Sequence, residues 1–444
     1  MTPNVIGAAS DQKLLATRSL GIFAARVVGT GLMLVATLLM ARMLGPEDFG
    51  LVFAIWAPVV LLSQMSTLNL TALATVEIAG ALARGEPGVA AGFVRFGRSA
   101  VAVAAPVAAL GACIFLSLRF PEAVAEAPLV LALVSVVVAV LGMQQLHAAQ
   151  AVALGQASDV QVPNDLLRPL VIVGALGLVW AMGGDVGPVF ALAVFSTGAS
   201  VALVMQLALT RGDFAALGEW GGITPVYWLK SALALAPSRM LMQQFRALAV
   251  MSASLSLGLA DTGVIALALS LVGLLTFGIL AVDMTFGPDL AQARVRRDNA
   301  ALGRILATSG LVRLVPVVAG CLVIGLAADP IVALFGMGFD GAGDVARVLL
   351  IVPLVRAALG NGRLLLQVDG HRGLLFCTSG IAILALLLLP QAPFVPREPL
   401  YVAICVAGVM VANSIAEWLL AWRIAGVDAS ASGAVRLLVR GATG

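Results

Sequence analysis

Apolar stretches about as long as a membrane-spanning helix follow one another from near residue 20 to residue 422. Because an α-helix needs roughly 20 apolar residues to cross the hydrocarbon core of a bilayer, we read the chain in windows of about that length. The pattern predicts about twelve spans, at 20–42, 50–82, 98–118, 125–152, 165–183, 187–210, 226–257, 262–289, 305–327, 346–367, 373–391 and 399–422. The predicted fold is therefore an all-α membrane protein of about twelve helices.

The connections between the spans differ in charge from one side to the other. Alternate connections on one side hold 17 of the 26 lysines and arginines, whereas the other side holds only Arg42, Arg119, Arg347 and Arg397. Basic residues are retained on the cytoplasmic side. Both termini are therefore predicted to be cytoplasmic.

A short segment recurs half a chain apart. Residues 44–50, LGPEDFG, match residues 257–263, LGLADTG, at four of seven positions. The same offset carries Arg26 onto Arg239 and Arg84 onto Arg297. Six spans per half keep both copies in one orientation, which predicts two six-helix pseudo-symmetric lobes related by an axis along the membrane normal.

The predicted domain organisation follows from this repeat. It is a cytoplasmic N-terminal segment 1–16, an N-terminal lobe 17–211, a cytoplasmic linker 212–224, a C-terminal lobe 225–424 and a cytoplasmic tail 425–444.

The repeated segment is predicted to form a tight turn between the first two helices of each lobe. Glycine supplies unusual backbone angles there, and the aspartate can cap the next helix. The turn residues are Gly45, Asp48, Gly50, Gly258, Asp261 and Gly263. Pro237 is expected to bend the seventh helix, either as a gate or as a static bend.

Three segments carry a family resemblance. Residues 41–50, ARMLGPEDFG, resemble the "ARxLGPxxFG" turn of bacterial polysaccharide-biosynthesis membrane proteins, the O-antigen flippase (Wzx-like) type within the multidrug/oligosaccharidyl-lipid/polysaccharide (MOP) exporter superfamily. Residues 335–339, FGMGF, resemble the family's outer "FGxxF" loop, and residues 366–372, LQVDGHR, its "LLxxTGxxR" connection. Asp369 stands where threonine is frequent, and residues 264–266, VIA, depart from the usual "GxYxxA", which indicates a divergent subfamily.

The resemblance implies a MOP/MATE-like fold around a central cavity in the bacterial inner membrane. It also implies that the protein flips a polyprenyl-pyrophosphate-linked oligosaccharide to the outer leaflet during surface polysaccharide synthesis. Its expected partners are this lipid-linked substrate, membrane lipids, H⁺ or Na⁺ as a coupling ion, and a polysaccharide polymerase and glycosyltransferases. No nucleic-acid partner is expected.

Charged side chains inside the predicted spans point to the nature of the cargo. Each costs about 2.5–3.5 kcal/mol near the bilayer centre, so each should face a wet cavity or a partner. Arginines outnumber acids among them: Arg26, Arg239, Arg246, Arg313 and Arg356 stand against Glu77, Asp283 and Glu417. This excess favours an anionic substrate.

Arg26 and Arg239 are the main candidates for binding an anionic head group, because the repeat places them at matching depths. Two guanidinium groups can clamp a pyrophosphate, unless each pairs with a local acid or snorkels. Arg246, two helical turns beyond Arg239 on the same face, and Arg356 are further substrate-binding candidates, with packing or ion-pair roles as alternatives. Arg313 is expected to snorkel to the cytoplasmic surface.

Glu77 and Asp283 are candidates for binding a coupling ion, since a carboxylate in a low-dielectric site can change protonation during a cycle. Alternatively, they neutralise the arginines. Glu417, close to Trp418 and Trp422, is expected to be an interfacial residue.

The sequence carries no catalytic constellation, so we predict a transporter and not an enzyme, without cofactor or metal. The chain has two histidines and four scattered cysteines, and its only lysines, Lys13 and Lys230, lie outside any phosphate-binding loop motif. Two other functions stay open. A cation-coupled drug or small-molecule antiporter of the same superfamily predicts an acid-dominated cavity, and a non-transporting scaffold for glycosyltransferases predicts dispensable arginines.

Overall fold

The computed structural model describes residues 5–219, 221, 222, 224–296 and 298–430, and all regular elements in these ranges are helical. Arg297, the repeat counterpart of Arg84, and residues 431–444 of the predicted tail lie outside the described residues. The longer helices are α1 (Val5–Ser66), α3 (Pro87–Arg119), α5 (Leu129–Ala153), α7 (Arg168–Ala181), α8 (Pro188–Ala215), α12 (Leu259–Val295), α13 (Asn299–Leu326), α18 (Arg372–Leu388) and α19 (Pro399–Leu420). The all-α prediction is confirmed.

Shorter helices connect, extend or interrupt these. They are α2 (Ala74–Ala83), α4 (Pro121–Glu126), α6 (Ala157–Val162), α9 (Pro225–Leu233), α10 (Ala236–Gln243), α11 (Phe245–Ser256), α14 (Ala328–Ala333), α15 (Ala342–Leu349), α16 (Ile351–Leu359) and α17 (Gly362–Val368). Four further short turns are η1 (Leu70–Ala72), η2 (Pro163–Leu167), η3 (Leu389–Gln391) and η4 (Ala421–Ala425).

Within the described residues, nine helices are long and apolar enough to cross a membrane. One of them, α1, contains two segments joined at a kink, because Gly45 has non-helical backbone angles, φ 70° and ψ 178°. The predicted spans 226–257 and 346–367 are each present as a run of short helices. The chain is a multi-pass membrane protein whose helices account for all twelve predicted spans.

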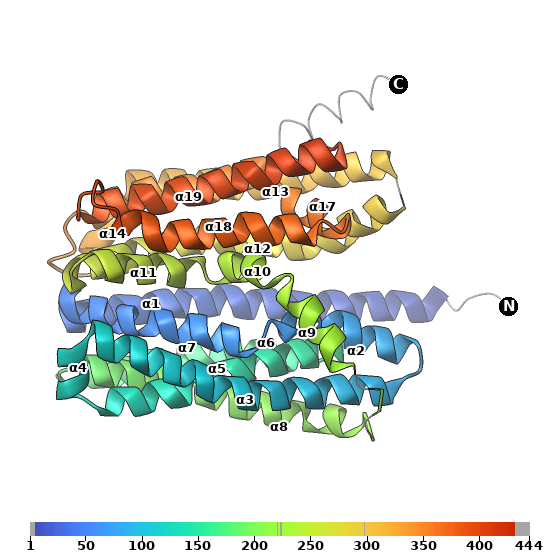
Figure 1. Ribbon diagram of the computed structural model, residues 1–444, viewed down its shortest axis with the longest axis horizontal. Coiled ribbons are helices and arrows are strands. Elements are labelled where there is room, and N and C mark those ends of the chain that lie inside the picture. The colour runs from blue at the N-terminus through green and yellow to red at the C-terminus, as the bar shows by residue number, and fades with distance from the viewer. Residues whose placement is uncertain (1–4, 220, 223, 297, 431–444) are drawn as a thin grey trace. The chain divides into compact units, whose positions relative to one another are not determined.

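The chain divides into two compact units. Unit 1 comprises Met1–Met43 and Leu62–Leu233, and unit 2 comprises Leu44–Leu61 and Ala234–Gly444. In unit 1, α5 packs against both α3 and α8, and these three helices run alongside one another in Figure 1. The lobe boundaries given by the sequence stay a prediction.

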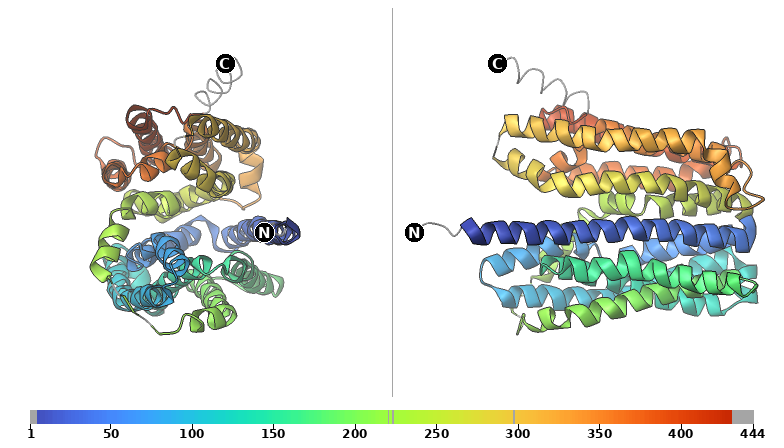
Figure 2. Two further views of the ribbon diagram at one scale, coloured as in Figure 1. Left: turned by 90° about the vertical axis from the view of Figure 1, so that its right-hand side faces the viewer. Right: turned by 180° about the vertical axis from the view of Figure 1, so that it is seen from behind.

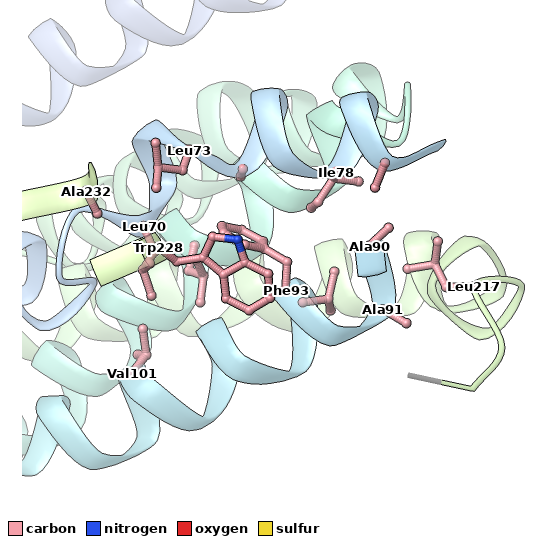
Figure 3. Close-up of a cluster of buried hydrophobic side chains, with 14 of the residues drawn as sticks. Leu70, Leu73, Ile78, Ala90, Ala91, Phe93, Val101, Leu217, Trp228 and Ala232 are labelled. Atoms are coloured by element: carbon pink, nitrogen blue, oxygen red, sulfur yellow. The ribbon is translucent and has the colours of Figure 1, made fainter. Parts of the chain in front are cut away.

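Helix α9 is anchored in unit 1 by a tryptophan. Trp228 is 1% exposed and packs edge-on against Phe93, with ring centroids 5.1 Å apart. Figure 3 shows its indole ring among apolar side chains of α2, α3 and η1. The Asn69 amide also donates a hydrogen bond of 2.7 Å to the carbonyl of Ala232. The start of the predicted seventh span therefore belongs to the core of unit 1.

In unit 2, α12 lies against α13 along its length, as the yellow and gold helices of Figure 2 show. Helices α15 and α16 both pack on α19, which also contacts α18. This arrangement surrounds the broken segment between α16 and α17.

The two copies of the repeated turn meet inside unit 2. A side chain at Gly50 would collide with the backbone of Leu259, and one at Gly263 would collide with the backbone of Pro46. Only glycine allows two helices to approach so closely. Asp261 lies in the first turn of α12, but the N-cap is Gly258 and no side chain caps it, so the predicted capping by Asp261 is wrong.

The FGMGF loop packs on the first copy of the turn. Phe339 is 2% exposed, and its ring meets that of Phe49 edge-on at 5.5 Å. Gly338 has φ 89° and lies so close to Pro46 that an added Cβ would approach the proline ring to 3.0 Å. The motifs that carry the family resemblance at residues 41–50 and 335–339 thus form one packed junction.

The departure from the family pattern at Asp369 has a structural reason. The Arg294 guanidinium donates two hydrogen bonds to the Asp369 carboxylate, at 2.8 and 2.7 Å. This bidentate pair raises the pKa of Arg294 and ties the end of α12 to the connection between α17 and α18. A threonine at position 369 could not replace this ion pair.

Replacing Gly50 or Gly263 with alanine should destabilise the protein, because the new methyl group overlaps backbone atoms that cannot rotate away. We expect a loss on the order of 1–3 kcal/mol. Thermal unfolding of the detergent-solubilised protein, followed by tryptophan fluorescence, measures this loss.

The control is Gly174→Ala on α7, where a Cβ meets nothing within 4 Å. That variant should be at least as stable as the parent, since alanine favours helix. Equal melting temperatures for all three variants would contradict the contact.

Candidate functional site

A cavity of about 190 Å³ lies within unit 2. Its lining comes from α10, α12, α13, α16, α17 and α19 and the break between α16 and α17. Five charged and two amide side chains line it: Asp283, Arg313, Arg356, Arg363, Glu417, Asn361 and Asn413. These residues are far apart in sequence, so the packing of the short helices on α19 brings them together.

The break between α16 and α17 positions part of this lining. Gly360 has φ 74°, a backbone conformation that other residues rarely adopt, and it packs against the carbonyl of Ala429. The helix therefore ends there and restarts at Gly362, which packs closely against the backbone of Glu417 and Trp418. Interrupted helices in membrane proteins occur where the backbone lines a cavity.

Arg313 is the most deeply buried charged group of the cavity. Its side chain is 1% exposed, and Nη2 donates hydrogen bonds of 2.6 Å to both the Asp283 carboxylate and the Asn361 carbonyl. The prediction that Arg313 snorkels to the surface is therefore wrong. The physical reason is that a carboxylate and a side-chain amide oxygen accept hydrogen bonds from Nη2 of Arg313 inside the bundle.

Two further arginines in the lining are held less tightly. The shortest ion-pair distance of Arg356 is 3.9 Å, to the second oxygen of Asp283. Arg363 has no ion pair or hydrogen bond among the described residues. The guanidinium groups of Arg356 and Arg363 repel each other, and Arg363 also repels Arg239 on α10. Arg363 therefore has a like charge on either side, an arrangement that favours binding of an anion beside it.

Glu417 lies in the cavity and is 8% exposed, so the expectation of an interfacial residue is wrong. Its carboxylate accepts a hydrogen bond of 3.2 Å from the amide of Asn413, one turn earlier on α19. Two buried amide atoms of this lining have no hydrogen-bond partner among the described residues, Nδ2 of Asn361 and Oδ1 of Asn413. Buried polar atoms without partners are costly, and a ligand that binds them removes that cost.

The charges of the lining do not cancel. Arg313, Arg356 and Arg363 carry three positive charges, against two negative charges on Asp283 and Glu417. The formal charge of the lining is therefore +1 when both carboxyls are ionised. Such a cavity can bind an anion through guanidinium groups that still have free donors.

The structure places Arg26 in unit 1. Its Nε donates to the Asp165 carboxylate at 3.1 Å, and the two side chains are 24% and 13% exposed. Gly29, one turn further along α1, packs directly on the Asp165 carbonyl of the π-helical turn η2. Arg26 therefore has a local acid, the alternative that the sequence left open. A clamp between Arg26 and Arg239 stays a prediction.

Pro237 and Arg246 lie in the seventh span, on either side of its break at Gln244. The chain leaves helical geometry between α10 and α11 at Gln244, so Arg246 does not continue the face of Arg239, and that expectation is wrong. Arg246 donates a 2.6 Å hydrogen bond to Ser270 and lies over the Phe53 ring, 5.0 Å from its centroid. Pro237 lies in the first turn of α10. The backbone N–H groups of this turn have no intrahelical hydrogen-bond acceptor in any helix, so a proline removes none there.

Glu77 binds a tryptophan. The indole Nε1 of Trp228 donates to the Glu77 carboxylate at 3.1 Å within unit 1. Its role in ion coupling stays a prediction, as does that of Asp283. The contact nevertheless gives Glu77 a structural partner that the sequence did not indicate.

A second buried polar group lies in unit 1, on α3, α5 and α8. The Arg98 guanidinium is 3.2 Å from Nδ1 of His147, and Nε2 of His147 is 2.9 Å from the Thr210 hydroxyl. Thr210 donates in turn to the carbonyl of Gln206, so it accepts from Nε2 of His147. This hydrogen-bonded chain fixes the neutral tautomer of His147 and ties the three helices together.

Sequence reasoning missed Arg363, Asn361 and Asn413. Arg363 lies close to the end of its predicted span, where an arginine is expected at the cytoplasmic side, and the amides carry no charge to mark them. The available signal was Gly360-Asn361-Gly362 inside an apolar span. Glycine and asparagine in this order interrupt helices, and an interruption within a span marks a candidate site.

Comparisons with solved structures identify the fold. An inward-facing MATE family multidrug resistance transporter of the MOP superfamily superposes with a TM-score of 0.67 at 12% identity, covering 90% of this chain and 95% of that one. The lipid II flippase MurJ, in an inward closed conformation, gives 0.64 at 12% identity, covering 91% and 87%. A MATE structure in the straight conformation gives 0.59 at 15% identity, covering 90% and 96%.

No protein-family model and no curated protein match the sequence. The structural likeness therefore establishes the predicted MATE-like fold, which this chain shares with MurJ, at identities that leave the function to be argued from the site.

Replacing Arg313 with methionine should destabilise the protein, because Asp283 then keeps its charge without its closest partner. We expect a loss on the order of 1–3 kcal/mol. The double variant Arg313→Met/Asp283→Asn removes both charges and should recover most of the lost stability. Thermal unfolding in detergent gives the three values. Additive losses in the double variant would show that the two residues do not interact.

Proposed function

We propose that this protein is a flippase that moves a polyprenyl-pyrophosphate-linked oligosaccharide across the bacterial inner membrane, with both termini cytoplasmic. The observation that carries the proposal is the net positive cavity of unit 2, whose arginines have free donors. The fold supports transport, since it is shared with a multidrug resistance transporter and with a lipid II flippase.

In this proposal the arginines bind the pyrophosphate. A guanidinium presents parallel N–H donors that match phosphate oxygens. Arg356 and Arg363 supply them from the lining, and Arg239 adds a third positive charge beside Arg363. The unpartnered Nδ2 of Asn361 provides one more donor to the same anion. Arg26 and Arg246 act earlier or later on the path, and alternating access carries the glycan through a wet interior.

The charge of the lining separates this function from its rivals. A cation or drug antiporter needs acids that outnumber the bases around its substrate, whereas this lining has three guanidiniums and two carboxylates. A scaffold that only gathers glycosyltransferases needs no buried arginine, and burying one costs free energy. A polymerase and glycosyltransferases that supply and use the substrate remain partners of the proposed flippase.

The test is transport in proteoliposomes. Purified protein is reconstituted with a short-chain prenyl-pyrophosphate disaccharide bearing a fluorophore, and delivery to the opposite leaflet is followed by quenching from outside. Arg356→Ala and Arg363→Ala should each slow delivery about tenfold or more, the equivalent of one charge-assisted contact of about 1.4 kcal/mol. Arg239→Ala should have a smaller effect, since Arg239 does not line the cavity.

The matched control is Arg347→Ala, which removes an exposed arginine paired with Asp329 and Asp344 outside this cavity. Delivery should be unchanged in that variant. Equal delivery by all four variants would disprove the proposed site. Transport of a cationic dye, without transport of the prenyl pyrophosphate, would favour the antiporter.

A further inference from the structure

The two carboxylates of the unit 2 cavity are held in different ways. Asp283 accepts a 2.6 Å hydrogen bond from Arg313, so its negative charge is matched at contact distance. Glu417 has no ion pair among the described residues, and it accepts a hydrogen bond from the neutral amide of Asn413. Glu417 is therefore the acid of the lining that no described arginine contacts at ion-pair distance.

Asn413 suits both protonation states of Glu417. Its Nδ2 now donates to the Glu417 carboxylate, while its Oδ1 is buried without a partner. If the amide turns by half a rotation, Oδ1 faces Glu417 and can accept a hydrogen bond from the protonated carboxyl. A positively charged partner would stabilise only the ionised form. An amide neighbour can form a hydrogen bond with Glu417 in either protonation state.

The charges that face Glu417 come from four helices. Arg356 of α16 and Arg363 of α17 act on it directly. Asp283 of α12 and Arg313 of α13 complete the charged lining. Among the described residues, the other elements that pack on α19, namely α11, α15, α18, η3 and η4, contribute no charged side chain to the lining. Protonation of Glu417 therefore raises the formal charge of the lining from +1 to +2.

We propose that Glu417 is a proton-linked counter-anion of this site. In the empty cavity its carboxylate compensates Arg356 and Arg363, and a bound anionic group takes over that role while Glu417 takes up a proton. This inference rests on the proposed function, because it assumes that the cavity binds an anion. By linkage, the anion binds more tightly at low pH, and anion binding draws a proton from solution.

The other intramembrane acids fit this role less well. Protonation of Asp283 would break its contact with Arg313 and leave that guanidinium buried without its acid. Glu77 lies in unit 1, where it accepts from Trp228 and does not line the cavity. Of the acids that the structure describes, Glu417 alone combines a place in the lining with a neutral partner that serves both of its states.

The experiment measures anion binding and proton uptake together. Methanedisulfonate is used as the probe, since it carries two negative charges at all relevant pH values and has no proton of its own to exchange. Isothermal titration calorimetry of the full chain in detergent is run from pH 6 to pH 8, in two buffers of different ionisation enthalpy. The difference in heat between the buffers gives the number of protons taken up.

The parent protein should take up a proton, up to one for each anion bound. Its affinity should fall with rising pH, by at most about tenfold per pH unit for one linked proton. Glu417→Gln should bind the probe with no proton uptake and with an affinity that is flat across the range. Glu417→Asp, which keeps an ionisable group, should retain uptake with a shifted midpoint, so a misfolded glutamine variant does not end the test.

Each remaining outcome decides between the two proposals. If Arg356→Ala abolishes binding but Glu417→Gln keeps full proton uptake, the counter-anion role is wrong and the anion site stands. If Glu77→Gln loses uptake and Glu417→Gln does not, the linked proton resides on Glu77. If the parent does not bind the probe at any pH, the anion site itself fails, and the inference fails with it. Glu126→Gln, on an exposed position of α4, is the control and should match the parent.

Discussion

The cavity of unit 2 depends on how a guanidinium can be buried among apolar helices. Arg313 is almost inaccessible, and it is tolerated because Asp283 and Asn361 both accept hydrogen bonds from it. This arrangement fixes the break after α16, since Asn361 is the first residue past Gly360. Because Asp283 is bound to Arg313, the guanidinium N–H groups of Arg356 and Arg363 keep donors that can bind an anion. With Arg313 and Asp283 neutralising each other, the remaining charges of the lining are the two guanidiniums of Arg356 and Arg363 against the one carboxylate of Glu417.

The same constraint explains why the fold contains broken helices. A continuous helix over residues 346–367 would hide its backbone groups and leave Asn361 no freedom to approach Arg313. The interruption at Gly360 exposes polar backbone only where polar side chains and a cavity can receive it. The break between α10 and α11 separates Arg239 from Arg246 in the same way. Arg239 is thereby left in electrostatic range of Arg363, whereas Arg246 contacts Ser270 and Phe53.

Much of the fold could be predicted from the sequence, because hydrophobic length alone identifies membrane-crossing segments. The twelve apolar stretches follow from this length, and the repeated turn follows from the match between residues 44–50 and 257–263. The site was predicted only in part. Counting charges within spans finds Asp283 and Arg356, but it cannot tell that Arg313 is paired or that Glu417 faces inward, since these depend on packing between distant helices. Asn361 and Asn413 are uncharged, so a count of charged residues does not identify them.

The anchoring of α9 in unit 1 bears on the order in which the molecule can assemble during synthesis. Trp228 completes the apolar cluster of unit 1, so that unit has its full set of core residues once Leu233 has left the ribosome. The segment Leu44–Leu61 belongs to unit 2 and is made some two hundred residues before its partner Gly263. Domains generally form as units in the order of translation. The segment Leu44–Leu61 is therefore synthesised before the helix that packs on it. Its surface at Gly50 stays uncovered until α12 has been synthesised.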